Sequence, residues 1–406
     1  MQPHATDPAT LDPFLPEHRD DPYPVYQRLR ELAPVLRGPR GAWLVTRHAE
    51  AAAVLRDPRF SVDVGKLAGG PPPDLGPARQ TGALLLFLDP PDHSRLRALV
   101  AKAFTPRVAE ALRPRVEQLV AELLDQVDGK DGFDVIASLA YPLPVAVICE
   151  LLGVPREDRE RFKGWSSDAS RLLDSGLDAD AQLRGMTAAL GLIQYFDGLF
   201  EERRTAEPGD DLLSALVAAE EAGDRLTADE LRATTVLLFL AGHETTMNLI
   251  GNGLYALLRH GDQLERWRAE PALARTAVEE LLRWDSPVQV TARIATSDVE
   301  LGGVTVAPGE QVVVLLGAAN RDPAVFAAPD RLDLGREPNR HLSFSAGVHF
   351  CLGASLARVE GQVALGALLQ RMPDLELAEP APVWREHLVL RGLKALRVAR
   401  GRRAHR

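Results

Sequence analysis

The chain has 406 residues, of which 46% are hydrophobic and 26% are charged, and its formal net charge at pH 7 is −10. This balance is typical of a globular protein with a large core, and the negative charge argues against nucleic acid as a main partner. Only two cysteines are present, which excludes a disulfide scaffold and a four-cysteine zinc site.

The N-terminal twenty residues, "MQPHATDPATLDPFLPEHRD", contain proline and acidic residues but no apolar stretch, so they do not read as a secretory or transit signal. The one segment long enough to span a bilayer is 235–259. Polar side chains from His243 to Asn252 interrupt it, and hydrocarbon penalises such groups. We therefore expect a long buried helix there, in a cytoplasmic protein.

Residues 20–58 mix helix and strand. Helical spacing of apolar residues marks "YPVYQRLRELAP" and "HAEAAAVLRDP", whereas "AWLVTR" is typical of a strand. Residues 64–83 are rich in glycine and proline, and we interpret this region, within 62–88, as a loop that acts as a lid. From 92 to 265 nearly every segment favours helix, as in "VEQLVAELLDQV".

The pattern changes after residue 286. "VQVTARIA", "DVELGGVTV" and "EQVVVLLGA" are predicted as short strands, turned at Gly302-Gly303 and at Pro308-Gly309. A helix returns after Cys351, and "HLVLRGLKALRVA" near the end is strand-like. The fold class predicted is mainly α with a minor β portion, and no linker divides the chain, so we expect one domain over 1–406.

Cysteine is the chemically informative residue of this chain. Cys149 lies in the apolar run "LPVAVICELLGVP" and is interpreted as a small core residue. Cys351 lies in "SFSAGVHFCLGASLAR", just before a predicted helix, where backbone N–H groups stabilise a thiolate. As a nucleophile it would need His349 to fold back across its own turn, and as a redox centre it would need a second cysteine. A haem ligand needs only one thiolate, with glycines and aromatic residues beside it.

The residues around Cys351 match a known pattern. In order they are Phe344, Gly347, His349, Cys351 and Gly353. This spacing resembles the haem-binding signature of bacterial cytochromes P450, from which it departs at Ser345, a position that is commonly glycine. The resemblance implies a haem b, with Cys351 as the iron ligand and with Phe344 and Gly353 against the macrocycle. The haem would lie between the long central helix and the helix that follows the cysteine.

A second match is "AGHETT", residues 241–246, inside the long helix. Gly242 in a helix interior costs about 1 kcal/mol relative to alanine, so it needs a reason, and small residues would leave room for dioxygen. A threonine hydroxyl turned toward a backbone carbonyl would also open the helix locally. By resemblance, Thr245 hydrogen-bonds dioxygen and Glu244 relays protons to it.

Two further matches concern the haem pocket. Glu280 and Arg283 stand three apart on one helical face, and the family anchors the cysteine loop with such a pair and a later arginine, for which "FAAPDRLDL" offers Arg331. The two haem propionates need cationic donors. By resemblance these donors are His93, Arg97, Arg293 and His349.

Substrate contacts are expected on the other side of the haem. Leu237, Ala241 and Thr245 share one helical face, with Leu240 alongside. The segment "PVQVTA", with Gln289 and Thr291, the loop 62–88 and residues 388–390 are expected to complete the pocket. Ordinary core packing remains the alternative for all these residues.

The resemblance covers nearly the whole chain and is closest to actinobacterial enzymes that tailor macrolides, polyketides and other secondary metabolites. It implies a monomeric monooxygenase that hydroxylates or epoxidises an apolar small molecule with O2. No flavin or iron–sulfur motif is present, so electrons would come from NAD(P)H through a ferredoxin reductase and a ferredoxin. The alternatives are a peroxide-driven haem-thiolate enzyme, a reductive or rearranging one, a haem-based sensor or ligand-binding protein without turnover, and a cysteine hydrolase.

Overall fold

A computed structural model describes residues 11–70, 84–174, 178–205, 209–221 and 226–401. Two compact units are present, and each is assembled from separate stretches of the chain. The first draws on Met1–Pro71, His260–Cys351 and Val383–Gly392, and the second on Pro72–Arg259, Leu352–Pro382 and Leu393–Arg406. The expectation of one domain stays a prediction. Most of the lid that we predicted, residues 71–83, lies outside the described residues.

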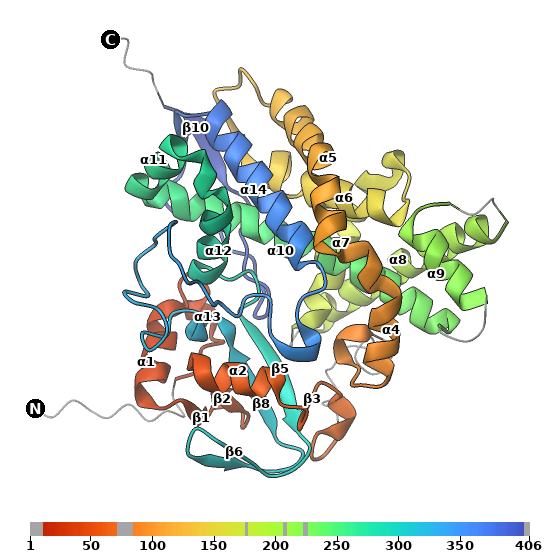
Figure 1. Ribbon diagram of the computed structural model, residues 1–406, viewed down its shortest axis with the longest axis vertical. Helices are drawn as coiled ribbons and strands as arrows, with labels where there is room; N and C mark the ends of the chain where they lie inside the picture. Colours follow the sequence, from red (N-terminus) through yellow and green to blue (C-terminus); the bar gives the residue numbers. More distant parts are fainter. Residues whose placement is uncertain (1–10, 71–83, 175–177, 206–208, 222–225, 402–406) are drawn as a thin grey trace, which may run out of the picture. The chain divides into compact units, whose positions relative to one another are not determined.

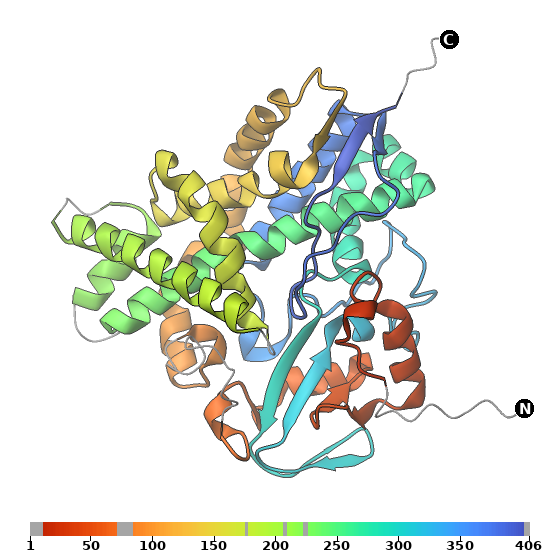
Figure 2. The same ribbon diagram turned by 180° about the vertical axis from the view of Figure 1, so that it is seen from behind.

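The first unit is built on a mixed five-stranded sheet in the order β1-β2-β8-β5-β3. Its strands are β1 (Val35–Arg37), β2 (Trp43–Val45), β3 (Phe60–Ser61), β5 (Val290–Ala295) and β8 (Gln311–Leu315). β2 pairs in parallel with β8, and the other neighbours are antiparallel, including the long β5–β8 pair that Figure 2 shows side by side. The strands predicted from "AWLVTR", "VQVTARIA" and "EQVVVLLGA" are therefore confirmed.

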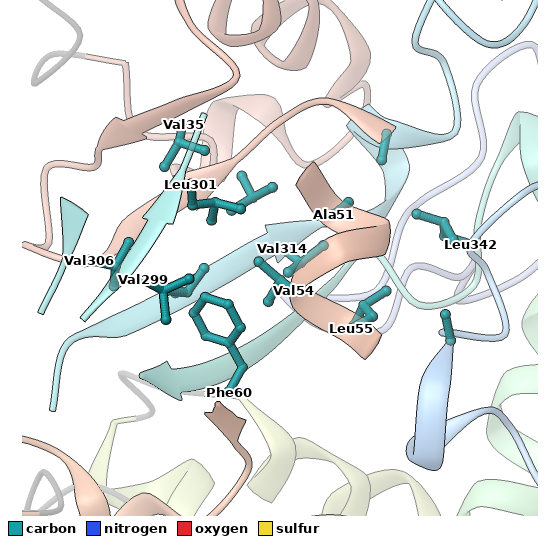
Figure 3. Close-up of a cluster of buried hydrophobic side chains, with 14 of the residues drawn as sticks. Val35, Ala51, Val54, Leu55, Phe60, Val299, Leu301, Val306, Val314 and Leu342 are labelled. Carbon is teal, nitrogen blue, oxygen red and sulfur yellow. The ribbon is translucent and has the colours of Figure 1, made fainter. Parts of the chain in front are cut away.

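Two helices cover opposite faces of this sheet. Successive strand residues point to opposite sides, so the apolar strands present apolar side chains on both faces. On one face α2 (His48–Arg56) packs Val54 against Val314 of β8, in the apolar cluster drawn in Figure 3. On the other face α1 (Tyr23–Leu32) packs Leu29 against a cluster that includes Leu315. Both predicted N-terminal helices are confirmed.

The rest of the first unit consists of a hairpin and short helices. These elements are β6 (Val299–Leu301), β7 (Val304–Val306), α11 (Gly261–Ala269), α12 (Ala274–Trp284) and α13 (Leu316–Ala319). The hairpin turns at the predicted Gly302-Gly303 pair, whose φ angles are +58° and +88°. Glycine adopts such angles without steric cost, which is why this pair marks the turn.

The second unit is mostly helical, as predicted for residues 92–265. Its helices are α4 (Asp92–Val100), α5 (Pro106–Asp125), α6 (Pro142–Leu152), α7 (Phe162–Ser170), α8 (Ala179–Thr205), α9 (Leu212–Glu221), α10 (Ala228–Arg259) and α14 (Ala354–Arg371). A π-helical turn, η6 (Ile136–Ala140), precedes α6. α14 lies beside α5, and α10 packs against both α6 and α14 (Figure 1).

The long helix α10 begins with a reciprocal cap. The Glu230 N–H donates to the Thr227 hydroxyl at 3.2 Å, and the Thr227 N–H donates to the Glu230 carboxylate at 2.9 Å. These two bonds satisfy N–H groups that the first helical turn leaves without partners. Among the described residues, no helix combines the length and apolar character needed to cross a membrane.

The C-terminal segment differs from the single strand that "HLVLRGLKALRVA" predicts. Leu390 forms an isolated bridge with Val288 in the first unit, and only β10 (Arg397–Arg400) is a regular strand, in a small sheet β4-β10-β9 of the second unit. That sheet also contains β4 (Gly132–Asp134) and β9 (Leu375–Leu377). The apolar alternation is therefore divided between an isolated bridge in the first unit and one strand of a sheet in the second.

Candidate active site

Cys351 ends a tight loop in the first unit. Its backbone N–H donates to the Phe344 carbonyl oxygen at 2.9 Å, which closes the loop. At Gly347 the φ angle is +71°, and a Cβ there would collide with the carbonyl oxygen of Leu55 on α2. Both the backbone angle and the space therefore require glycine. The loop presents Cys351 as an exposed residue, and α14 starts at Ala354, as predicted.

Ser345 is the one strained residue of this loop. Its φ angle of +60° lies in the left-handed region, which costs a residue with a Cβ roughly 1 kcal/mol. Its N–H donates to the Leu342 carbonyl oxygen at 2.8 Å. This hydrogen bond closes the turn with which the loop begins, and Ser345 has its left-handed backbone angle within that turn. Ser345, the one departure from the family pattern, therefore occupies a position at which glycine would have no backbone strain.

Glu280 on α12 forms the centre of a buried ion network. Its carboxylate accepts from Arg283 Nε at 2.7 Å and from Arg283 Nη2 at 2.8 Å, and both side chains are wholly buried. Arg283 also donates to the carbonyl oxygens of Asn320 and Pro329. Because buried charges are costly without such partners, the network fixes the segments that supply them.

The second arginine of this network is Arg336, so our expectation of Arg331 was wrong. Arg336 Nε lies 3.1 and 3.0 Å from the two carboxylate oxygens of Glu280. Arg331 has an exposed side chain and contributes its backbone carbonyl oxygen, which accepts from Arg283 at 3.3 Å. The Asp333 N–H donates to Glu280 at 3.0 Å, and the residues after this contact, rather than those before it, turn back to the carboxylate.

The start of the cysteine loop is held by residues that sequence reasoning missed. Asn320, which follows α13, donates to the Ser343 hydroxyl at 2.8 Å and accepts from the Leu342 N–H at 2.7 Å. The Ser343 hydroxyl donates in turn to the Leu282 carbonyl oxygen on α12 at 2.7 Å. A fully buried asparagine at the end of the apolar run "VVVLLGAAN" was the available signal, because a buried amide needs partners.

In the second unit, "AGHETT" lies in the middle of α10, and the helix is continuous through it. Thr245 Oγ1 donates to the Ala241 carbonyl oxygen one turn earlier at 3.0 Å, the contact that the sequence indicated. His243 and Glu244 are buried, whereas Thr245 is half-buried and Ala241 is exposed. The threonine hydroxyl therefore lies on the more exposed face of an otherwise buried helix.

The predicted substrate contacts of α10 share this face. Leu237 and Leu240 are half-buried, in a stretch where Val236, Leu238 and Phe239 are buried. Leu237, Ala241 and Thr245 recur every four residues, which places them one above another on the helix. The helical-face prediction is thus consistent with the burial pattern, and their contact with substrate stays a prediction.

Gly242 has a packing reason that the sequence did not indicate. A Cβ at this position would lie 2.8 Å from Cγ1 and 2.9 Å from Cδ1 of Ile148 on α6. Glycine here therefore lets α6 and α10 approach closely, at a cost in helix propensity of about 1 kcal/mol. The expectation that small residues here leave room for dioxygen stays a prediction, and Ala241 lies on the exposed face.

Arg293 and Thr291 lie on the same face of β5, two residues apart. The Arg293 Nη1 donates to the Thr291 hydroxyl at 3.0 Å and to the Ala292 carbonyl oxygen at 2.8 Å. Arg293 is buried, and Thr291 and His349 are half-buried. Thr291, expected to contact substrate, thus orients the arginine that we expected to bind a propionate.

His93 and Arg97 lie one turn apart on α4, as predicted. His93 is only 2% exposed, and burial, together with the nearby Arg97 charge, lowers the pKa of its imidazole below the ordinary value. At neutral pH this side chain is therefore a neutral hydrogen-bond donor. Its expected contribution to propionate binding is a hydrogen bond, while Arg97 carries the positive charge.

Two segments predicted to line the substrate pocket meet in the first unit. Leu390 bridges Val288, and the Gln289 N–H donates to the Val389 carbonyl oxygen at 2.9 Å. The Gln289 side chain, however, donates to the Ser286 carbonyl oxygen at 2.7 Å and is 3% exposed. Its predicted substrate contact is therefore corrected to a structural role, which strand alternation alone could not distinguish.

The residues present fit a haem. Cys351 offers an exposed thiol, and His349 and Arg293 offer donors in the first unit. In the second unit, Gly353 has an ordinary φ of −84°, and a Cβ there would meet no atom within 4 Å. The packing of the chain therefore does not require glycine at position 353. The close approach of a flat macrocycle would require it, because a side chain there would hold the macrocycle away from the backbone.

Cys149, by contrast, has no features of a ligand. It is fully buried on α6, and burial raises the pKa of its thiol to about 12. A thiolate is the species that attacks electrophiles or binds metals, so this cysteine is inert at neutral pH. The prediction of a small core residue is confirmed.

Comparison with known proteins gives a consistent result. The sequence profile of the family described as "Cytochrome P450" matches residues 69–379. The chain is 46% identical over 393 residues to the 6-deoxyerythronolide B hydroxylase of Saccharopolyspora erythraea, covering 93% of this chain and 96% of that one. It is 44% identical over 371 residues to the biotin biosynthesis cytochrome P450 of Bacillus subtilis, covering 89% and 92%.

The fold is also that of solved structures. The crystal structure of P450BioI in complex with hexadec-9Z-enoic acid ligated acyl carrier protein aligns with a TM-score of 0.88 and 43% sequence identity. The alignment covers 95% of this chain and 99% of that one. A fold of mainly helices with a minor β portion is thereby confirmed.

Proposed function

The chain belongs to the cytochrome P450 family and is a cytochrome P450 monooxygenase, and on this premise we propose that it hydroxylates or epoxidises an apolar secondary metabolite of the macrolide or polyketide class. Similarity to a 6-deoxyerythronolide B hydroxylase supports the substrate class. The observation that carries the proposal is the exposed Cys351 on its closed loop, together with the Thr245 hydroxyl on the exposed face of α10.

Haem bound through Cys351 would supply oxygen activation and the transfer of one oxygen atom to substrate. His93, Arg97, Arg293 and His349 would hold its propionates. The chain's own chemical task is proton delivery. The Thr245 hydroxyl can exchange its bond to the Ala241 carbonyl for one to dioxygen, and the buried Glu244 can supply the protons.

Each unit, taken by itself, has apolar side chains that we expect to contact substrate. On α10 these are Leu237, Leu240 and Ala241, and in the first unit they are Val288 and Leu390, which the bridge between their backbones holds together. Such a lining gives affinity through burial of apolar surface and selects shape more than polarity. A bulky apolar ring is the kind of substrate that suits this apolar lining.

The remaining partners follow from the same proposal. We infer that a ferredoxin and its NAD(P)H-dependent reductase supply electrons, since the sequence contains no flavin or iron–sulfur motif. A monomeric protein in the cytoplasm would suit such soluble donors. A peroxide-driven enzyme would have less use for the buried Glu244 beside Thr245, which is why delivered protons are preferred.

Spectroscopy of the purified protein tests this function. Reduced with dithionite and exposed to carbon monoxide, it should show the strongly red-shifted Soret band of thiolate-ligated haem. Substrate-induced spin shifts with a macrolactone, hexadec-9Z-enoic acid and testosterone should then be largest for the macrolactone. A Soret band typical of histidine-ligated haem would overturn the ligation, and a spin shift confined to the fatty acid would overturn the substrate class.

A further inference from the structure

Residues 383–392 fold back on themselves in the first unit. The Arg385 N–H donates to the Gly392 carbonyl oxygen at 2.9 Å, so the two ends of this segment lie side by side. Between these ends Leu390 pairs with Val288, just before β5. We call Val288 and Leu390 the apolar pair, because they are the side chains of the first unit that we expect to contact substrate.

Two backbone hydrogen bonds flank the apolar pair. The Gln289 N–H donates to the Val389 carbonyl oxygen at 2.9 Å, and the Arg391 N–H donates to the Pro287 carbonyl oxygen at 2.8 Å. In an antiparallel pair enclosed in this way, the two side chains lie close together on one face. The apolar pair therefore forms one continuous surface.

The residues on either side of Leu390 face the opposite way. Val389 packs against the apolar cluster that contains Leu29 of α1. Successive residues of an extended chain point to opposite sides, so Arg391 points to the same side as Val389. The α1 side of the segment thus carries Arg391, and the other side carries Leu390.

The Arg391 guanidinium is anchored at three points. Its Nε donates to Asp285 Oδ1 at 2.7 Å, its Nη1 to the Arg19 carbonyl oxygen at 2.6 Å and its Nη2 to the Asp20 carbonyl oxygen at 2.9 Å. Arg391 and Asp285 are each 8% exposed. Hydrogen bonds to a charged group are strong, and three of them in a fixed fork leave this guanidinium little freedom.

Aromatic residues complete this anchor. Arg391 Cζ lies 3.5 Å from the centroid of the Trp384 ring, near the other end of the segment. The Tyr23 hydroxyl donates to the same oxygen of Asp285 at 2.8 Å, so α1 also fixes the carboxylate that holds Arg391. The anchor therefore joins the segment 383–392 to α1, to the residues before α1 and to the end of α12.

We propose that Arg391 is a positioning residue for substrate selection, which fixes Leu390 beside Val288 from the opposite side of the segment. This role depends on the proposed function, because it requires the apolar pair to contact substrate. One methylene group gained or lost in a hydrophobic pocket changes selectivity about 10–200-fold. A small displacement of Leu390 should therefore be visible in substrate binding.

Arg391→Lys removes the anchor and keeps the charge. One ammonium group cannot bond Asp285 and two carbonyl oxygens in the geometry of the guanidinium fork. Asp285→Asn changes the partner and leaves Arg391 in place, so it should act in the same direction and guards against a misfolded Arg391 variant. All measurements use holoenzyme with the carbon monoxide band of thiolate-ligated haem.

Arg321→Lys is the matched control. Arg321 is also 8% exposed and stacks on Tyr23, with its Cζ 3.5 Å from the ring centroid. Its side chain, however, donates to the Trp284 carbonyl oxygen and to Asp330, and none of these bonds reaches residues 383–392 among the described residues. This substitution should therefore cost stability without moving the apolar pair.

Amide hydrogen exchange without ligand measures whether the segment is held in place. The amides of residues 289 and 391 donate the two bonds that flank the apolar pair, so their exchange reports on it directly. Arg391→Lys and Asp285→Asn should each make both amides exchange about tenfold faster. Arg321→Lys should leave both rates within about twofold of the wild type.

Substrate binding then measures selection. The probes are 6-deoxyerythronolide B, hexadec-9Z-enoic acid and testosterone, with Kd taken from the spin shift. For the probe with the largest shift in the wild type, Arg391→Lys should raise Kd about tenfold. In a Leu390→Ala background the same change should have less than about a twofold effect, because the side chain that Arg391 positions is gone.

Three results would contradict this role. They are exchange rates unchanged in both anchor variants, an equal effect of Arg391→Lys on Kd with and without the Leu390 side chain, and an equal effect of Arg321→Lys on Kd. All three leave the proposed function intact, because it depends on the carbon monoxide band and on the macrolactone shift. A shift confined to the fatty acid would remove the proposed substrate class, and the same comparison made with that acid would still decide the role of Arg391.

Discussion

Replacing Arg336 by methionine tests the corrected ion network quantitatively. Glu280 is wholly buried, and the Arg336 side chain is 11% exposed. The variant loses the N–H contacts at 3.1 and 3.0 Å but keeps both Arg283 contacts. Breaking a buried ion pair costs about 3–5 kcal/mol, and because Glu280 retains one arginine we expect the lower end, about 3 kcal/mol.

Arg331→Met is the matched control, since it makes the same chemical change five residues earlier on an exposed side chain. We expect its effect to stay within about 0.5 kcal/mol. Urea unfolding of the haem-loaded protein, followed by circular dichroism and by the Soret band, measures both variants. Equal destabilisation by the two substitutions, or a larger effect at Arg331, would refute the assignment of Arg336.

Four further outcomes are expected. Ser345→Gly should raise the free energy of unfolding by up to about 1 kcal/mol in the same urea assay, because it relieves the left-handed backbone at that residue; a loss of stability would contradict this. The pKa of His93 is lowered in the folded protein, so protonation of His93 favours the unfolded state. The wild type should therefore lose stability relative to His93→Gln as the pH falls below the ordinary imidazole pKa of 6.5. A stability difference that does not change with pH in thermal unfolding would exclude this. Cys351→Ala should abolish the thiolate Soret band while Cys149→Ala retains it, and the reverse would show that the ligand is misassigned. Thr245→Ala should keep spin shifts with substrate but divert electrons to hydrogen peroxide, measured as peroxide released per NAD(P)H; full coupling would remove Thr245 from the reaction.

Local patterns explain why much of the fold was predictable. Strand alternation identified β5 and β8, and the Gly302-Gly303 pair identified the turn between β6 and β7, because both signals depend on residues close in sequence. The cysteine loop was also recognisable, since Gly347 has a left-handed angle that favours glycine in any such loop. The bond from Thr245 to Ala241 follows directly from helical geometry.

The errors arose where residues distant in sequence decide the outcome. Arg331 and Arg336 belong to one irregular segment, and only its path around Glu280 determines which guanidinium reaches the carboxylate. The polar side chain of Gln289 suggested a binding residue, but its amide nitrogen donates to the Ser286 carbonyl oxygen. The contact of Gly242 with Ile148 was missed, because it depends on a helix nearly a hundred residues earlier, which no local pattern contains.

The contact between Gly242 and Ile148 couples the size of two positions on different helices. A methyl group added at 242 would overlap the Ile148 side chain, and the helices would have to move apart or the isoleucine would have to change its rotamer. A redesign of the α10 surface that enlarges residue 242 should therefore reduce residue 148 in the same step, for example Gly242→Ala with Ile148→Ala. The volume available beside Thr245 is in this sense set partly by α6.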